Sequence, residues 1–354
     1  MGNAAIRLFT VAEVTGNTEA LAGYADPANL ITAFDDGWRH RLISNVDGGG
    51  DDPALMLGLH GDRVVVRLAF YSAEVQYEQK RFRTYWLCGF FRDPSHPDRA
   101  IAGRLFLQAL SRCGSVVACG SPAPRTRELY RAAGLREMER LQRYVYFYRT
   151  APIVEKYVRS RLLAVPLAVA TDPLRRLYYA VRSCRWRPVL TFHPVARFSA
   201  DLDSLLIGDT RNCFVKSSAK LNWVLDCRSS EAFEIRRNGR LAGYCILRQR
   251  VETGGGTHSL PTMSIGCLSD YYLDDASPAS REDLLHWAIR HFRGSGAEVF
   301  ECQAQEPALL AACSRLALAR LGGHYVFLKL PRGVESSSER PWFYTHGTGD
   351  VLIS

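Results

Sequence analysis

The stretch RELYRAAGL, residues 127–135, predicts a helix that ends abruptly. Leu129 and Ala133 lie four positions apart and share one apolar face, and Tyr130 adds an aromatic side chain beside them. Gly134 follows, and a glycine in the left-handed conformation ends many helices. Runs typical of strands flank this helix at residues 115–119 and 142–148. The helix therefore connects two strands.

The same order of predicted elements occurs in both halves of the chain: a hairpin, a strand, a helix, a strand, a helix and a strand. In the first half these elements fall at residues 54–59 and 64–71, 83–91, 98–111, 115–119, 125–133 and 142–148. In the second half they fall at residues 233–237 and 241–247, 262–268, 281–292, 298–302, 307–321 and 324–330. The order predicts an α/β (α+β) protein with two mixed, mostly antiparallel sheets flanked by helices.

The length of the chain predicts two domains. It has 354 residues, and one domain for roughly every 150 residues gives about two. We place a first domain at 1–150, a basic helical linker at 151–200 and a second domain at 201–354. With 47% hydrophobic and 23% charged residues, the composition excludes a disordered chain and favours a globular one.

No segment has the features of a membrane span or a metal site. The longest wholly apolar run, residues 162–170, is about half of the roughly 20 residues that a span needs. Residues 1–9 lack a basic region followed by an apolar one, so we expect no secretory signal and a cytoplasmic protein. The ten cysteines never occur as Cys-x-x-Cys and mostly lie in apolar runs. We therefore expect buried thiols and no bound metal.

Positive charge gathers between residues 149 and 187, where nine basic residues occur with two acidic ones. The apolar residues of this segment recur at helical spacing, which predicts short basic amphipathic helices broken near Pro166 and Pro173. Such a segment attracts phosphates, so its candidate partners are an anionic membrane surface, a lipid-linked substrate and tRNA. The alternative is a solvated linker whose apolar face packs on a neighbouring domain.

The element order and RELYRAAGL together resemble the GCN5-related N-acetyltransferase (GNAT) family. In that family the corresponding helix commonly reads Leu-Tyr-x-x-x-Gly-Phe, which Leu129, Tyr130 and Gly134 match, while Leu135 replaces the phenylalanine. The upstream stretch RDPSHPDRAIAGRLF, residues 92–106, resembles the family's loop for the pyrophosphate of acyl-CoA. The resemblance implies two GNAT-like domains and acetyl-CoA or another acyl-CoA as cosubstrate.

The implied cofactor site places backbone N–H groups at the start of a helix, where small residues let two phosphates approach. Pro97 and Ala100 depart from the family's usual Arg/Gln and first glycine, and Asp98 brings a competing negative charge. The corresponding stretch of the second half is less suited to bind phosphates, since residues 270–283 carry five carboxylates and no Gly-x-Gly. We therefore place acyl-CoA in the first half. The residues expected to hold it are Phe90, Phe91, Arg99, Ala100, Ile101, Ala102, Gly103 and Arg104.

The resemblance also implies catalytic roles. Tyr130 corresponds to the acid that protonates the departing thiolate, and backbone N–H groups of residues 87–91 would polarise the thioester carbonyl. We expect Glu78, or Glu74 near it, to act as the base from the loop before that strand. Asp270, at the end of a candidate strand, is expected to face the substrate.

These features predict an acyl-CoA-dependent N-acyltransferase whose acceptor is a small-molecule or lipid-linked amine. The second half would shape the acceptor pocket or support the fold. Two alternatives stay open. Fem-type peptidyltransferases also pair two domains of this fold and use aminoacyl-tRNA as donor. A tandem module without catalysis would bind a ligand or partner between its halves, and the departures at Pro97 and Ala100 favour this last alternative.

Overall fold

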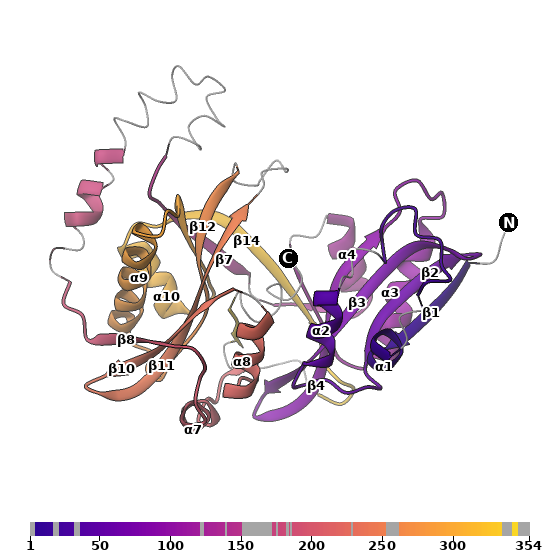
Figure 1. Cartoon of the computed structure of the whole chain (residues 1–354), viewed down its shortest axis with the longest axis horizontal. Helices are drawn as coiled ribbons and strands as arrows, with labels where there is room; N and C mark the ends of the chain where they lie inside the picture. Colours follow the sequence, from indigo (N-terminus) through magenta and orange to yellow (C-terminus); the bar gives the residue numbers. More distant parts are fainter. Residues whose placement is uncertain are drawn as a thin grey trace, which may run out of the picture.

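The computed structural model describes residues 4–16, 21–31, 36–120, 124–138, 140–150, 172–174, 176–181, 184, 186–227, 229–252, 262–334 and 342–345. Within these ranges the chain forms two halves that lie side by side, each a sheet with helices packed on it (Figure 1). The fold is α/β with a mixed, mostly antiparallel sheet, which confirms the fold class predicted from the order of elements.

The first half contains β1 (Ala4–Thr10), α1 (Val11–Gly16), α2 (Asp36–Ile43), β2 (Pro53–His60), β3 (Arg63–Tyr77), β4 (Lys80–Arg92), α3 (Ala100–Arg112), β5 (Val116–Gly120), α4 (Pro124–Ala132), β6 (Arg136–Glu137) and β7 (Leu141–Phe147). The second half contains β8 (Leu190–Val195), α7 (Asp201–Ile207), β9 (Asn212–Phe214), α8 (Ser218–Cys227), β10 (Glu231–Arg237), β11 (Arg240–Glu252), β12 (Met263–Leu273), α9 (Pro278–Arg293), β13 (Val299–Ala304), α10 (Pro307–Arg315), β14 (Ala319–Lys329) and β15 (Trp342–Phe343). Residues 172–174 and 176–181, which lie between the two halves in the sequence, are also helical.

β3 carries packing on both of its faces. Its side chains are buried along nearly the whole strand, which explains why the sequence shows an unbroken apolar run there instead of alternation. On one face, α3 packs Leu105 and Phe106 into a core with Phe70. On the other face, Tyr71 and Val75 share a core with α1, α2 and part of the second half. β3 therefore lies between the helices of its own half and the other half of the molecule.

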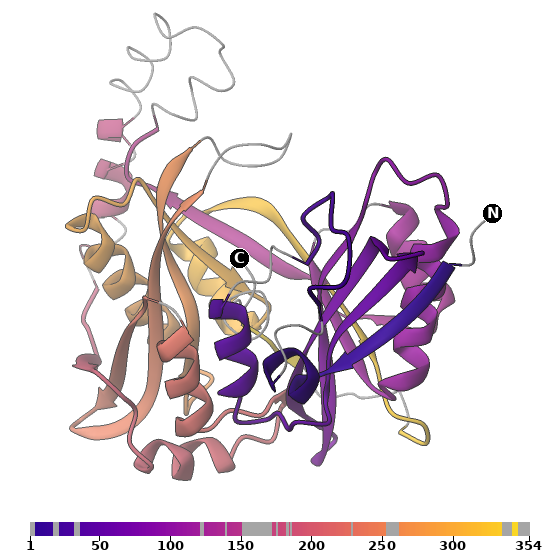
Figure 2. The ribbon, with the colours of Figure 1, turned by 45° about the vertical axis from the view of Figure 1, so that its right-hand side comes forward.

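The last strands of the two halves change places. The sheet order is β1-β2-β3-β4-β5-β14-β7-β13-β12-β11-β10-β8, so β14 from the second half pairs with β5, and β7 from the first half pairs with β13. β7 and β14 also pair with each other, and in Figure 2 they run between the two halves. Each sheet is thus completed by a strand of the other half. The domain boundaries near residues 150 and 201 stay a prediction.

A second joint connects the halves away from the exchanged strands. β9 pairs with β3 at Val75↔Phe214, and β15 pairs in parallel with β9 at Trp342↔Asn212. The ring of Trp342 lies 5.6 Å from that of Tyr77 on β3. This joint places β9 alongside the end of β3, where Cys213 and Phe214 line the groove described below.

The remaining sequence expectations have mixed outcomes. Seven of the nine cysteines that the structure describes are buried as expected, but Cys184 is exposed and Cys227 is half-buried. Across the described ranges, no helix is long and apolar enough to cross a membrane. In the same ranges, no group of histidine, cysteine and acidic side chains is arranged to hold a metal ion.

Candidate functional site

β4 and β5 form a parallel pair that opens at one end. Their pairing runs from Tyr85↔Val116 to Leu87↔Ala118 and stops there, although both strands continue. β4 also bulges against β3 just beyond this point, where Gly89 has a φ of +57°. The opening separates the backbone groups of the two strands, so a ligand placed there can pair with them.

The loop between this opening and α3 is held firmly. Asp93 accepts hydrogen bonds from the N–H and the hydroxyl of Ser95, at 2.8 and 2.6 Å, and forms an ion pair with Arg63. The Ser95 hydroxyl and Arg63 lower the pKa of Asp93 to about 2, so the carboxylate stays charged. His96 packs against His60, with 3.3 Å between their ring nitrogens. The start of α3 is therefore fixed relative to β4.

Asp98 occupies part of the predicted cofactor niche. One carboxylate oxygen accepts a hydrogen bond from the N–H of Ala100 at 2.9 Å, and the other accepts one from Arg104 at 2.7 Å. The side chains of Asp98 and Arg104 are 37% and 56% exposed. Exposed ion pairs contribute about 0 to 1 kcal/mol, so a diphosphate can take Arg104 from Asp98 at small cost. The niche holds a displaceable side chain and is not sealed.

The other residues of the predicted cofactor site lie in different environments. Ile101 is fully buried in the core, so only its backbone can contact a ligand. Phe90 packs on the α3 side with its ring 5.9 Å from that of Phe106. Phe91 is exposed, and the guanidinium of Arg67 lies 4.8 Å from its ring centroid. The remaining positions are exposed or half-buried: Arg99, Ala100, Ala102 and Gly103.

Tyr130 belongs to an aromatic stack that leads to the bulge in β4. Its ring stacks on Phe106 at 4.9 Å and meets the edge of Phe327 at 5.1 Å, while Phe106 lies against Phe90 beside the bulge. Phe327 is on β14, so the exchanged strand supports this tyrosine. Burial raises the pKa of the Tyr130 hydroxyl to about 12. The hydroxyl therefore stays protonated at neutral and at moderately alkaline pH.

The two candidate bases lie in different places. Glu78 is exposed at the tip of the β3–β4 hairpin, with a φ of +49°, and its N–H donates to the Asn212 side chain. β4 begins at Lys80, beside this tip, and Gly89 lies nine residues further along the strand. The distance between them is therefore about 30 Å. The structure does not bring Glu78 to the opening. The sequence predicted that Glu74 lies in a loop. Instead it lies within β3, because β3 extends to Tyr77.

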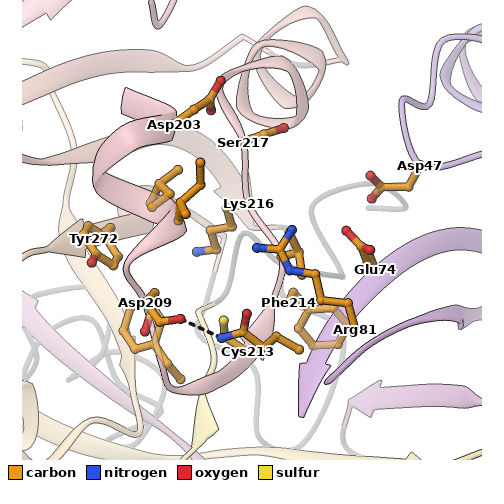
Figure 3. Close-up of a pocket in the computed structure, with 15 residues that line it drawn as sticks. Asp47, Glu74, Arg81, Asp203, Asp209, Cys213, Phe214, Lys216, Ser217 and Tyr272 are labelled. Atoms are coloured by element: carbon orange, nitrogen blue, oxygen red, sulfur yellow. Dashed lines mark hydrogen bonds between the residues drawn. The ribbon is translucent and has the colours of Figure 1, made fainter. Parts of the chain in front are cut away.

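Three adjoining hollows form a groove between the halves, and Phe214 lines all of them. The largest has a volume of about 330 Å³ (Figure 3). Trp86 and Val117 pair one step before the β4–β5 opening, and each lines one of the other two hollows. The groove therefore reaches the back of the opening. Its charged lining residues are Asp47, Glu74, Arg81, Asp203, Asp209, Lys216, Lys220 and Asp270.

Asp270 is the centre of a buried network beside this groove. It is 4% exposed and forms an ion pair with Lys216. It also accepts hydrogen bonds from the hydroxyls of Thr345, at 2.7 Å, and Tyr244, at 3.1 Å. Both carboxylate oxygens are thus engaged by the protein, and the side chain that reaches the largest hollow is that of Lys216. In this structure Asp270 positions Lys216.

Lys220 joins the two halves across the groove. Its ammonium lies 2.7 Å from Asp47 and donates to Asn45 at 2.8 Å, both in the first half, and it lies over the ring of Trp223. Burial lowers the pKa of Lys220, and Asp47 opposes this shift. The expected site residues included neither Lys216 nor Lys220. The sequence feature that could have pointed to these two residues is the rarity of lysine. Lysine occurs only at residues 80, 156, 216, 220 and 329.

The second half uses its equivalent loop for internal ion pairs. Arg281, near the start of α9, is fully buried and contacts Glu306 at 2.6 Å and Asp275 at 2.9 Å. Glu306 also accepts a hydrogen bond from the Tyr271 hydroxyl at 2.7 Å. A guanidinium and two carboxylates therefore take the place at which a phosphate loop would lie, in line with the acidic sequence of this stretch.

Replacing Lys216 with methionine should destabilise the protein by about 3–5 kcal/mol, because Asp270 would remain buried and charged without its partner. Urea unfolding measures this difference. The exposed hairpin lysine provides the control, and Lys80→Met should change stability by less than about 0.5 kcal/mol. Combining Lys216→Met with Asp270→Asn should recover part of the loss. If Lys216→Met alone is as stable as the wild type, Lys216 and Asp270 do not form a buried ion pair.

No family model matches the chain, and no curated protein matches its sequence. Solved structures do match it. A GCN5-related N-acetyltransferase from Anabaena variabilis gives a TM-score of 0.55 at 13% identity, covering 93% of this chain and 73% of its own. A putative acetyltransferase from Pyrococcus horikoshii gives 0.51 at 12%, covering 99% and 96%. N-myristoyltransferase from Saccharomyces cerevisiae, with bound myristoyl-CoA, gives 0.54 at 9%, covering 99% and 83%.

These similarities extend over nearly the whole chain, but the identities are low, so they bear on the fold and not on the activity. They agree with the mixed sheet flanked by helices described above. The chain therefore has the fold of the GCN5-related N-acetyltransferases.

Proposed function

We propose that this protein is an acyl-CoA-dependent acyltransferase that acts on an amine, with its donor site in the first half. The observation that carries the proposal is the opening between β4 and β5 beside the Gly89 bulge, with a protonated Tyr130 in the adjoining stack. The neighbour that was solved with myristoyl-CoA supports an acyl-CoA as the class of cosubstrate.

The residues of the first half divide the work of acyl transfer. Backbone N–H groups of residues 99–104 would hold the diphosphate, with Arg104 released from Asp98. When bound, the cosubstrate supplies an activated thioester. Backbone N–H groups of β4 near Gly89 would polarise its carbonyl while the amine forms the C–N bond and the C–S bond breaks. Tyr130 then gives a proton to the leaving sulfur, and the amine loses one to solvent.

The groove between the halves is the proposed acceptor site. Glu74 is half-buried, lines two of its hollows and has no ion pair among the described residues, so it can bind a cationic group of the acceptor other than the reacting amine. In the register of β3 and β4, Glu74 lies opposite Arg83. Arg83 is four strand residues, or about 13 Å, from Leu87 at the opening. At that distance direct removal of the reacting proton is excluded, and we assign Glu74 to acceptor binding.

Binding of CoA tests the donor site directly. Acetyl-CoA at one hundred times its Kd should stabilise the protein by about 2.7 kcal/mol in a thermal-shift series. Asp98→Asn should tighten Kd about two- to fivefold, because it removes a negative charge at the start of α3. Asp226→Asn, which alters an exposed aspartate in the second half, is the matched control.

The same series separates the alternatives. If neither acetyl-CoA nor myristoyl-CoA stabilises the protein while aminoacyl-tRNA does, the donor is that of the Fem-type enzymes. If none of these three stabilises it, the protein is a binding module and the proposed transferase activity is wrong.

Tyr130→Phe should lower kcat about 100-fold with little change in the Kd for acetyl-CoA, because it removes the acid and keeps the stacked ring. Release of the CoA thiol in the presence of primary amines measures the rate. Since burial raises the pKa of Tyr130 to about 12, its protonated form persists and no alkaline loss of kcat below about pH 11 should come from this residue. Tyr325→Phe is the control, and equal rates for both variants would remove Tyr130 from the mechanism.

Glu74→Gln should raise the KM for a diamine acceptor about tenfold or more and leave kcat within about twofold, because the hydrogen bond to the second, charged amino group is lost. The matched control is Glu78→Gln at the hairpin tip, which should change neither constant. A fall in kcat at unchanged KM would instead identify Glu74 as a base that works through water.

A further inference from the structure

Residues 172–174 and 176–181, here called the outer helix, leave an apolar stripe in solvent. Leu174, Leu177, Tyr178 and Val181 are 68%, 62%, 46% and 61% exposed. Their spacing of three, four and seven positions places them on one side of a helix. Stripes of this kind normally pack on a core. These four side chains therefore do not form the packed face of the linker alternative, while residues 151–171 of the basic segment lie outside the described residues.

The outer helix is fixed to the second half through its other side. Tyr179 is 4% exposed, and its hydroxyl lies 2.9 Å from a ring nitrogen of His286 on α9. At the helix start, Asp172 accepts hydrogen bonds from the N–H and the hydroxyl of Thr150, at 3.1 and 2.8 Å. Figure 1 shows the helix, in pink, at the outer side of the second half, away from the first half. The stripe is therefore displayed on an anchored element.

Positive charge lies directly behind the outer helix. Arg149, Arg176, Arg290 and Arg293 line a hollow of about 780 Å³ between the helix and the body of the second half, and Glu298 is the one acidic residue among the described residues of its lining. Within the part of the chain that the structure describes, none of these four arginines is paired with a carboxylate. The surrounding sequence, residues 149–187, has nine basic and two acidic residues. Arg290 and Arg293 lie over the rings of Trp186 and Tyr179, which leaves their positive charge able to attract an anion.

We propose that the outer helix docks the protein on an anionic lipid surface. The stripe would enter the boundary between headgroups and acyl chains, as amphipathic helices do. The four arginines would then lie about one helix diameter, roughly 10 Å, above the stripe. That height falls within the headgroup layer and within the Debye length of about 10 Å at 0.1 M salt, so the arginines attract the lipid phosphates.

The stripe and the charge together favour lipid over other occupants. RNA would satisfy the arginines and could stack a base on Tyr178, but Leu174, Leu177 and Val181 offer it neither hydrogen bonds nor a ring. A second copy docked on the stripe would cover the apolar side chains but would supply no anion to the arginines on the other side of the helix. A lipid surface satisfies both features at once. This inference does not depend on the proposed acyl transfer.

Vesicle flotation with the full chain tests the proposal. At 0.1 M NaCl the protein should bind vesicles of 70% phosphatidylcholine and 30% phosphatidylserine, remain free of pure phosphatidylcholine vesicles, and dissociate in 0.5 M NaCl. Leu174→Ser with Leu177→Ser should weaken binding about tenfold or more. Arg149→Gln with Arg176→Gln should weaken it about 10- to 25-fold, at about fivefold for each arginine. The matched control is Ile43→Ser with Val251→Ser, two side chains of similar exposure elsewhere, and it should bind within twofold of the wild type.

Each result decides the question. All replaced side chains are exposed, so every variant should melt within about 2 °C of the wild type, which keeps loss of binding separate from loss of folding. No binding to the phosphatidylserine vesicles, equal binding to both vesicle types, or full binding by the leucine variant overturns the proposal. A nucleic-acid surface would give a different pattern. The protein would bind tRNA and no vesicles, the arginine variant would lose tRNA binding, and the leucine variant would keep it.

Discussion

The pairing of β14 between β5 and β7 is the constraint on which the rest of the molecule depends. Without β14, both neighbouring strands would expose unpaired N–H and C=O groups along an edge, and neither sheet would be complete. The same strand carries Phe327, whose ring supports Tyr130. The proposed acid is therefore held in place by a residue from the far end of the chain, and the two halves act as one folded unit.

The two parts of the candidate site differ in how firmly they are held. On the acceptor side, Lys216 and Asp270 form a buried pair, and Lys220 reaches Asp47 across the groove. Breaking such pairs leaves charges without water or partner, at a cost of several kcal/mol, so the groove keeps its width. On the donor side, Asp98 and Arg104 are exposed and their pair contributes little, so the niche adapts to a ligand.

The two halves share a fold but differ in the loop that precedes the first long helix after the hairpin. In the first half, the loop before α3 leads to a helix start with small residues and a displaceable carboxylate. In the second half, Arg281 fills the corresponding place with ion pairs to Asp275 and Glu306. Internal charges there replace any external anion, and the second half contributes its side chains to the groove instead. The fold alone thus does not decide which half can bind a phosphate.

The sequence by itself determined the local elements, because periodicity and turn chemistry act within a few residues. Gly134, at φ +82°, ends α4 as RELYRAAGL predicts, and the predicted hairpin at residues 233–237 and 241–247 and the repeated order of elements are also present. Only the tertiary structure decided that β7 and β14 change places, because an apolar strand does not encode which strand it will pair with. It also decided that Glu74 and not Glu78 reaches the groove, and that Lys216 lies beside Asp270. The surroundings of a charged side chain depend on which distant segments pack against it, and a single sequence does not record that choice.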